Sequence, residues 1–115
     1  MPHVTIEFAK GLEQTYDMQE LCDQLFEVLA AKSAFDAADI KIRASRVDYY
    51  RIGTEPQSFV HATLLLMQGR EESVRLDLNQ TILDVLRSFL PDVGSITVQD
   101  VEMVRVTYLK SLVGG

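Results

Sequence analysis

The chain has 115 residues, of which 47% are hydrophobic and 24% are charged. This size and composition are those of one globular domain with a hydrophobic core. Eleven Lys and Arg against 17 Asp and Glu leave a net charge of -6, so we expect no nucleic-acid partner and no anionic membrane surface. Its single cysteine, Cys22, cannot form an intrachain disulfide, and no secretory signal or membrane-spanning apolar run is visible, so we expect a cytoplasmic protein.

The first strand and helix are predicted by two different periodicities. Residues 3–8 alternate between apolar and polar side chains, as a half-buried strand does. Asp17 is followed three residues later by Glu20, which is the spacing of a helix start, and apolar residues then recur at helical spacing to about Lys32. We therefore expect one strand followed by one helix.

A second strand closes the first half of the chain. Residues 40–50 are strand-like, but their apolar positions change from even to odd numbers, which predicts a bulge or bend near Ser45. Gly53, Thr54 and Pro56 then indicate a turn.

The second half of the chain predicts the same three elements. Residues 59–67 are more uniformly apolar than residues 3–8, which is typical of a strand inside a sheet that is covered on both sides. An amphipathic helix is expected from about Ser73 until Pro91 ends it, and residues 96–108 are expected to form the last strand.

The two halves also share residues at a constant offset. A shift of 58 pairs His3 with His61, Thr5 with Thr63, Gly11 with Gly69, Glu13 with Glu71 and Leu25 with Leu83, and a shift of 59 pairs Arg46-Val47-x-Tyr49 with Arg105-Val106-x-Tyr108. We interpret residues 1–115 as a single domain made by duplication, with pseudo-repeats of about 2–57 and 59–115.

This order of elements predicts an α+β fold built from two β-α-β units. Each unit needs a right-handed crossover, so the four strands form one sheet with both helices on one face. The opposite face is then bare. We expect Leu64, Leu66, Val104 and Val106 to exceed what two helices can cover, which predicts self-association through that face. The alternative is a monomeric ferredoxin-like sandwich.

Most catalytic motifs are absent from the sequence. It contains no phosphate-binding loop, dinucleotide fingerprint, nucleophile elbow or zinc-protease helix. His3 and His61 have no third ligand at a suitable spacing, and Cys22 lies on the apolar stripe of its helix, where a buried side chain is the expected role. We expect neither a metal nor another cofactor.

Pro2 is the residue that suggests chemistry. If Met1 is removed, the chain begins with a secondary amine held at the start of a strand. Partial burial and nearby cations favour the neutral form of such an amine, which suits a general base. The simpler interpretation is a harmless proline on an edge strand.

Basic residues in this acidic chain gather in two places. Lys41 and Arg43 share one face of the predicted second strand, and Arg46 and Arg51 follow closely. Arg70 comes directly after Gly69 at a strand-to-helix loop, where helix amides also favour anions. A carboxylate is the ligand that this pattern indicates, although Arg46 and Arg51 are equally explained by surface solubility.

The sequence resembles the tautomerase superfamily, and within it the 5-carboxymethyl-2-hydroxymuconate delta-isomerase family, over about residues 2–75. Beyond residue 75 only the order of elements agrees. The resemblance rests on Pro2-His3, Ala38-Asp39-Ile40-Lys41-Ile42-Arg43, Val47-Asp48, Phe59-Val60-His61-Ala62-Thr63-Leu64 and Gly69-Arg70.

That resemblance implies a homotrimer that shifts a proton on a small unsaturated di- or tricarboxylic acid without a cofactor. It implies that Pro2 is the base, that Arg70 binds a substrate carboxylate, and that Lys41 or Arg43 orients the substrate. The most natural alignment places Lys41 on an arginine of the family, which weakens bidentate carboxylate recognition. Two alternatives stay open: a non-catalytic trimeric scaffold of the same fold, and a ferredoxin-like regulatory domain that binds a metabolite.

Overall fold

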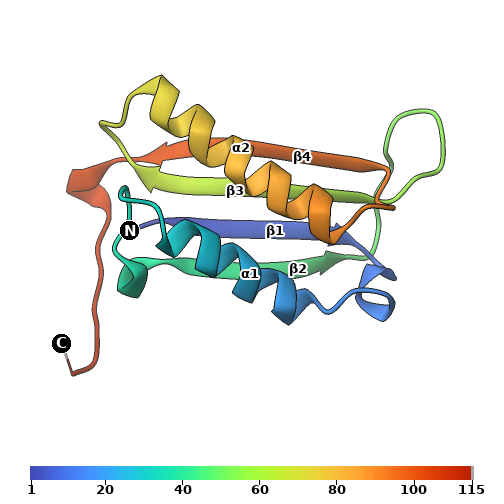
Figure 1. Ribbon diagram of the computed structural model, residues 1–115, viewed down its shortest axis with the longest axis horizontal. Coiled ribbons are helices and arrows are strands. Elements are labelled where there is room, and N and C mark those ends of the chain that lie inside the picture. Colours follow the sequence, from blue (N-terminus) through green and yellow to red (C-terminus); the bar gives the residue numbers. More distant parts are fainter. Residues whose placement is uncertain (115) are drawn as a thin grey trace.

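The computed structural model describes residues 1–114, which form one four-stranded sheet with two α-helices on one face (Figure 1). Along the chain the elements are β1 (His3–Ala9), α1 (Met18–Ala30), β2 (Lys41–Val47), β3 (Phe59–Met67), α2 (Glu72–Phe89) and β4 (Ser95–Met103). The strand order is β2-β1-β3-β4, with β1 parallel to β2, β3 parallel to β4, and β1 antiparallel to β3. The predicted fold class is therefore confirmed.

The even-numbered residues of the strands face the helices and form the core. The apolar pattern of β1 and β3 places side chains of one parity under α1 and α2, and these side chains are almost fully buried. The core comprises chiefly Val4, Ile6 and Phe8 of β1, Val60, Ala62, Leu64 and Leu66 of β3, Leu21, Leu25 and Leu29 of α1, and Leu78, Ile82 and Leu86 of α2. The largely apolar β3 is an inner strand, as its composition predicts.

The helices begin where their sequences indicate. The side chain of Asp17 accepts a hydrogen bond from the backbone N–H of Glu20 at 3.1 Å, so Asp17 is the N-cap of α1. This helix ends at Ala30, two residues before the predicted end. None of the helices in residues 1–114 has the length and apolar character needed to cross a bilayer.

The predicted bulge near Ser45 is wrong. Pairing between β1 and β2 is continuous from His3 opposite Lys41 to Ala9 opposite Val47. The chain leaves the sheet after Val47, so the apolar residues that follow have no part in the strand alternation.

The predicted end of the last strand is also wrong. β4 stops at Met103, and a short 3₁₀ helix, η3 (Arg105–Thr107), turns the chain away from the sheet. The residues from Val104 to Tyr108 alternate as a strand does, but they lie beyond the end of β3, where no partner strand continues. Figure 1 shows that the segment after η3 leaves the sheet at the end where the chain begins.

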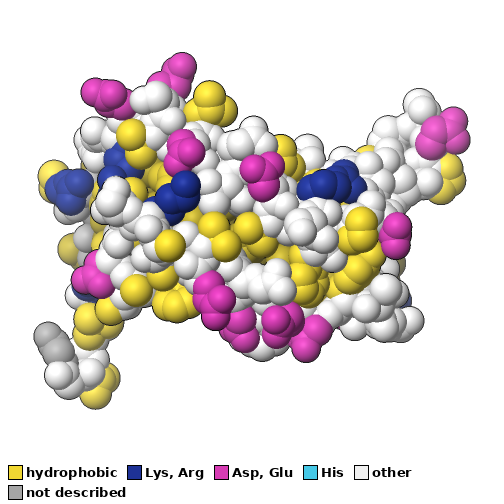
Figure 2. Space-filling model, viewed as in Figure 1, with side chains coloured by type: hydrophobic (Ala, Val, Ile, Leu, Met, Phe, Trp, Pro, Cys, Tyr) yellow, Lys and Arg dark blue, Asp and Glu magenta, His cyan; other side chains and the backbone are white. Residues whose placement is uncertain are grey.

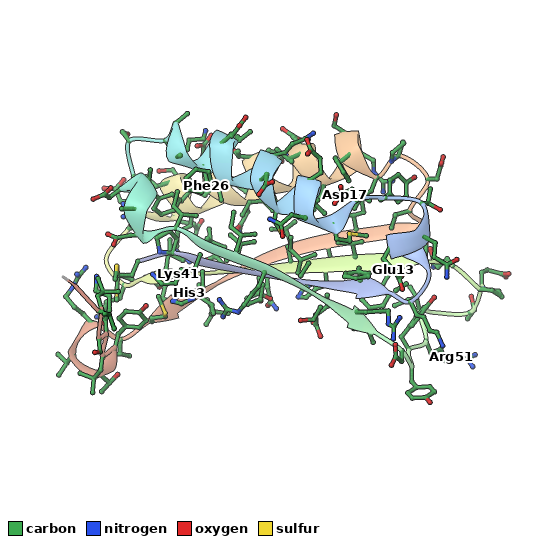
Figure 3. All side chains as sticks on the ribbon, turned by 90° about the horizontal axis from the view of Figure 1, so that it is seen from below. His3, Glu13, Asp17, Phe26, Lys41 and Arg51 are labelled. Atoms are coloured by element: carbon green, nitrogen blue, oxygen red, sulfur yellow. The ribbon has the colours of Figure 1, made fainter. Side chains whose placement is uncertain are left out.

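The bare sheet face has a composition different from the one expected. Leu64 and Leu66 lie under the helices, because the alternation of β3 has the opposite phase to the one expected. Val104 and Val106 lie beyond the end of β4 and are exposed outside the sheet. We call the side without helices the open face; it carries the odd-numbered residues of the four strands (Figure 3). On β3 and β4 these are His61, Thr63, Leu65 and Met67 with Thr97, Gln99, Val101 and Met103.

Candidate functional site

The amino terminus is fixed at one end of the sheet. Pro2 is buried, and its carbonyl oxygen accepts a hydrogen bond from the backbone N–H of Lys41 at 3.0 Å. Pro2 therefore extends the pairing of β1 with β2 by one residue instead of lying on a frayed tail. While Met1 is attached, the ring nitrogen of Pro2 belongs to an amide and is not basic.

Three basic side chains surround this end of the chain. Burial lowers the pKa of the Met1 amino group; Asp39 opposes this shift, and the positive charges of Lys41, Arg70 and Lys110 reinforce it. We call Lys41, Arg70 and Lys110 the terminal cations. Figure 2 shows basic side chains near this end of the helix-covered face and a line of acidic ones over α1.

Arg70 is held by the loop between β3 and α2. Gly69 has a φ of 109°, a left-handed conformation that favours glycine, and it turns the chain just before Arg70. The Nη2 group of Arg70 donates to the carbonyl oxygen of Ala34 at 2.7 Å, and the guanidinium carbon lies 5.4 Å from the centre of the Phe35 ring. Its Nε–H is buried and finds no acceptor within residues 1–114.

A small pocket of about 260 Å³ opens beside this arginine. Its wall consists of Met67, Gln68, Gly69, Arg70 and Arg105, from the end of β3, the following loop and η3. Two guanidinium groups therefore line one opening at the same end of the sheet as the amino terminus.

Lys41 and Lys110 meet at Asp39. The Nζ atom of Lys41 donates to the backbone oxygen of Asp39 at 3.1 Å, and the Nζ atom of Lys110 lies 3.7 Å from its carboxylate. Lys110 also approaches the thioether sulfur of Met1 at 3.5 Å. Asp39 therefore contacts two ammonium groups beside the first residue, one through its backbone oxygen and one through its carboxylate.

Arg43 belongs to a different set of contacts. Its Nη1 atom lies 3.1 Å from Nδ1 of His3, whose Nε2 lies 2.8 Å from the hydroxyl of Tyr108. A guanidinium only donates, so Nδ1 of His3 accepts and Nε2 carries the proton. Burial, and next the charge of Arg43, lower the pKa of His3. Of the two predicted strand cations, Lys41 is therefore a terminal cation, whereas Arg43 contacts His3.

Tyr108 and Lys110 are neighbours of the site that the sequence pattern did not indicate. Both follow η3; Tyr108 is the last residue of the stretch predicted as a strand, and Lys110 lies beyond it. Their contacts with His3, Met1 and Asp39 join the two ends of the chain. No local spacing signals a contact across more than 70 residues.

The other candidates have structural contacts. Burial raises the pKa of the Cys22 thiol, which favours the protonated form over a nucleophilic thiolate. His61 lies 2.6 Å from the Thr97 hydroxyl and 2.8 Å from the Gln99 amide nitrogen on the open face. Arg46 forms ion pairs with Glu13 and Asp48. Across residues 1–114, no three His, Cys, Asp or Glu side chains cluster as metal ligands.

Comparisons with known proteins agree with this fold. The family model described as 5-carboxymethyl-2-hydroxymuconate isomerase matches residues 2–98. A crystal structure of a 5-carboxymethyl-2-hydroxymuconate isomerase from Deinococcus radiodurans R1 is 26% identical and has a TM-score of 0.78, covering 96% of this chain and 88% of that one. No curated protein matches the chain by sequence.

Two more distant structures share the fold. A 5-carboxymethyl-2-hydroxymuconate delta-isomerase has a TM-score of 0.79 at 19% identity, over 99% of this chain and 89% of that chain. A protein described as "Q0 fused 4-OT wild type symmetric trimer" has a TM-score of 0.76 at 12% identity, over 98% and 93%.

Proposed function

Because this chain belongs to the 5-carboxymethyl-2-hydroxymuconate isomerase family, and is thus an isomerase, we propose that it shifts a proton on an unsaturated 2-hydroxy or 2-oxo carboxylic acid without a cofactor. The observation that carries the proposal is the gathering of Lys41 and Arg70 around the first residues of a chain with a net charge of -6. The substrate class that fits this site resembles 5-carboxymethyl-2-hydroxymuconate, with carboxylates that pair with these cations.

Pro2 is the proposed base once Met1 has been removed. The ring nitrogen is then a secondary amine in the buried, cationic surroundings that lower the pKa of the Met1 amino group. A lowered pKa leaves more of the amine neutral near pH ~7 and able to accept a proton. The amine takes the proton of the enol hydroxyl as the carbonyl forms, and it returns a proton to a carbon of the conjugated chain. Nothing is oxidised or reduced overall.

The cations orient the substrate for this transfer. The planar guanidinium of Arg70 suits a carboxylate, and its place in the wall of a pocket beside Arg105 supports this role. Lys41 offers a point charge, which attracts a carboxylate or a developing enolate oxygen with less geometric constraint. Within one chain Arg43 contacts His3, so any effect of Arg43 on the reaction would pass through His3.

We also propose that the active molecule is a trimer in the cytoplasm. The open face carries apolar side chains such as Leu65 and Val101 without a covering layer in one chain. A related fold is described as a symmetric trimer, which supports the proposal. Such an assembly would cover the open face and bring neighbouring chains near Pro2.

A rate assay with matched variants tests the proposed reaction. Protein lacking Met1 is mixed with 5-carboxymethyl-2-hydroxymuconate and with 2-hydroxymuconate, and loss of the conjugated enol is followed by ultraviolet absorbance. Pro2→Ala and Arg70→Ala are expected to lower kcat/KM by about a hundredfold or more. Arg51→Ala is the control because Arg51 lies at the opposite end of the sheet from Lys41 (Figure 3). Undiminished rates in both site variants would refute the assignment.

The amino terminus of the natural protein separates this proposal from the scaffold alternative. Intact mass spectrometry of protein from its native source shows whether Met1 is present. A mass without Met1 leaves the Pro2 amine available for catalysis. A mass with Met1 leaves an amide there, and a non-catalytic trimeric scaffold becomes the better interpretation.

A further inference from the structure

Arg105 is brought beside Arg70 by the turn that follows β4. The backbone N–H of Gln68 donates to the carbonyl oxygen of Met103 at 3.0 Å, and the side-chain oxygen of Gln68 accepts from the backbone N–H of Arg105 at 3.0 Å. These two hydrogen bonds join the loop that carries Arg70 to the start of η3. The two arginines therefore line one pocket although they are far apart in the sequence.

The side chain of Arg105 has no hydrogen-bond or ion-pair partner within residues 1–114. Every other arginine of the chain uses its guanidinium in a hydrogen bond, for example Arg75 with Asp100 at 3.0 Å and Arg87 with the carbonyl oxygen of Val93 at 2.8 Å. The recorded contact of Arg105 is made by its backbone N–H. Its five guanidinium N–H donors therefore stay available for an anion.

The charges around this pocket are matched by one negative group. Arg70 and Arg105 carry the charge of the wall, whose other residues, Met67, Gln68 and Gly69, are neutral. One carboxylate already touches the wall, because Glu102 accepts from the backbone N–H of Gly69 at 3.3 Å. Two guanidinium groups against this carboxylate leave one positive charge. The pocket volume of about 260 Å³ suits the carboxylate end of a ligand better than a whole ligand.

We propose that Arg105 is a further substrate-binding residue, which together with Arg70 binds one carboxylate of the substrate. This inference rests on the proposed function, because Arg70 is common to both. Arg70 contributes its Nη1 group, which has no partner within residues 1–114 and, unlike Nε, is not buried. Two planar guanidinium groups offer paired donors to the two oxygens of a carboxylate.

Arg105 is expected to act on binding and not on the proton transfer. The charge of Arg70 contributes to the lowered pKa of the Met1 amino group, whereas Arg105 is not among the charges in residues 1–114 that shift this pKa. Removing Arg105 should therefore leave the proposed proline base unchanged. The expected signature is a raised KM with an unaltered kcat.

A kinetic test uses protein lacking Met1 and 2-hydroxymuconate as substrate. Arg105→Ala is expected to raise KM by about tenfold while kcat stays within about twofold of the wild type. Arg105→Lys should raise KM less, because it keeps the charge and loses the paired donors. The matched control is Arg51→Ala, at the opposite end of the sheet (Figure 3), which should change neither constant. An unchanged KM in Arg105→Ala overturns the inference.

A binding measurement keeps the inference testable if no isomerase activity is found. Calorimetry compares hexanedioate with hexanediamide, which has no charge; neither compound can isomerise. Arg105→Ala is expected to bind hexanedioate about tenfold more weakly than the wild type and Arg51→Ala do, and all three proteins should bind hexanediamide poorly. Equal affinities of the two variants for hexanedioate, or no binding by the wild type, reject the carboxylate site. Binding that depends on Arg105 in a protein without isomerase activity would refute the proposed reaction and leave the carboxylate site standing.

Discussion

His3 joins the open face to the carboxy-terminal segment through two nitrogens with fixed roles. Nδ1 accepts from Arg43, and Nε2 donates to Tyr108. Protonation of Nδ1 would put two donors face to face. Burial and, after it, the charge of Arg43 therefore hold the pKa of His3 below the value of 6.5 that applies to an unfolded chain.

This lowered pKa predicts a loss of stability in mild acid. Below about pH 6.5 the unfolded chain binds a proton at His3 that the folded chain does not, so the free energy of unfolding falls as the pH falls. The urea midpoint of the wild type should therefore drop between about pH 7.5 and about pH 5.5 more than that of His3→Gln. His61→Gln is the matched control, because it leaves the contacts of His3 intact. Parallel pH profiles for wild type and His3→Gln would contradict the prediction.

Part of the site could be predicted because its residues lie at recognisable positions in local elements. Lys41 begins a strand that pairs with the start of β1, and Arg70 follows a glycine at a strand-to-helix loop. The contacts of Lys110 and Tyr108 with His3, Met1 and Asp39 could not be predicted in this way. Their positions depend on where η3 turns the chain, and hydrophobic periodicity carries no information about such a turn.

At the scale of elements, prediction succeeded where one face of an element is buried. β1 and both helices have a single apolar phase, and each is found where that phase indicates. Errors arose where an apolar residue follows an element without belonging to it. Tyr49 after β2 is 93% exposed, and Val106 after β4 is 87% exposed. Alternation alone cannot tell such residues from a continuing strand, because a strand ends where its partner ends.

A polar contact connects α2 to β4. Asp100 accepts from Arg75 at 3.0 Å and from Asn79 at 2.8 Å, two residues one helical turn apart. Burial raises the pKa of the Asp100 carboxyl, but these hydrogen bonds outweigh that effect and leave the pKa below its ordinary value of 3.8. The charged form of Asp100 therefore stabilises the folded chain above that pH.

Removing this carboxylate should destabilise the protein. Asp100→Ala leaves Arg75 and Asn79 without their shared acceptor, and we expect the free energy of unfolding in urea to fall by about 2 kcal/mol at neutral pH. The difference from wild type should shrink below about pH 4, where the unfolded carboxyl is protonated and the charged pair is being lost. Asp84→Ala, which removes an exposed carboxylate on α2, should change stability by less than about 0.5 kcal/mol. Equal effects of the two substitutions would show that the contact contributes nothing specific.

At the scale of the whole molecule, the open face is the feature that one chain leaves incomplete. Its centre is polar, where His61 hydrogen-bonds to Thr97 and to Gln99, and Leu65 and Val101 lie nearer the amino-terminal end. This mixture explains why a single chain tolerates the face while its apolar part still favours a partner. The sequence-based choice of Leu64 and Leu66 for this face had the wrong parity, although the prediction of an uncovered face does not depend on them.

The proposed trimer predicts that a charge on this face separates the subunits without unfolding them. Light scattering of the wild type should give three times the chain mass of 13.0 kDa. Val101 is already 44% exposed in one chain, so Val101→Lys should preserve the fold, seen as an unchanged circular dichroism spectrum, yet place an ammonium group in the interface, where burial is unfavourable. The control is Leu76→Lys on α2, which is 65% exposed on the helix-covered side and should stay trimeric. A wild type of 13.0 kDa would favour the monomeric sandwich instead. If Leu76→Lys dissociated and Val101→Lys did not, the subunits would associate through the helices, and neighbouring chains would not approach Pro2 across the open face.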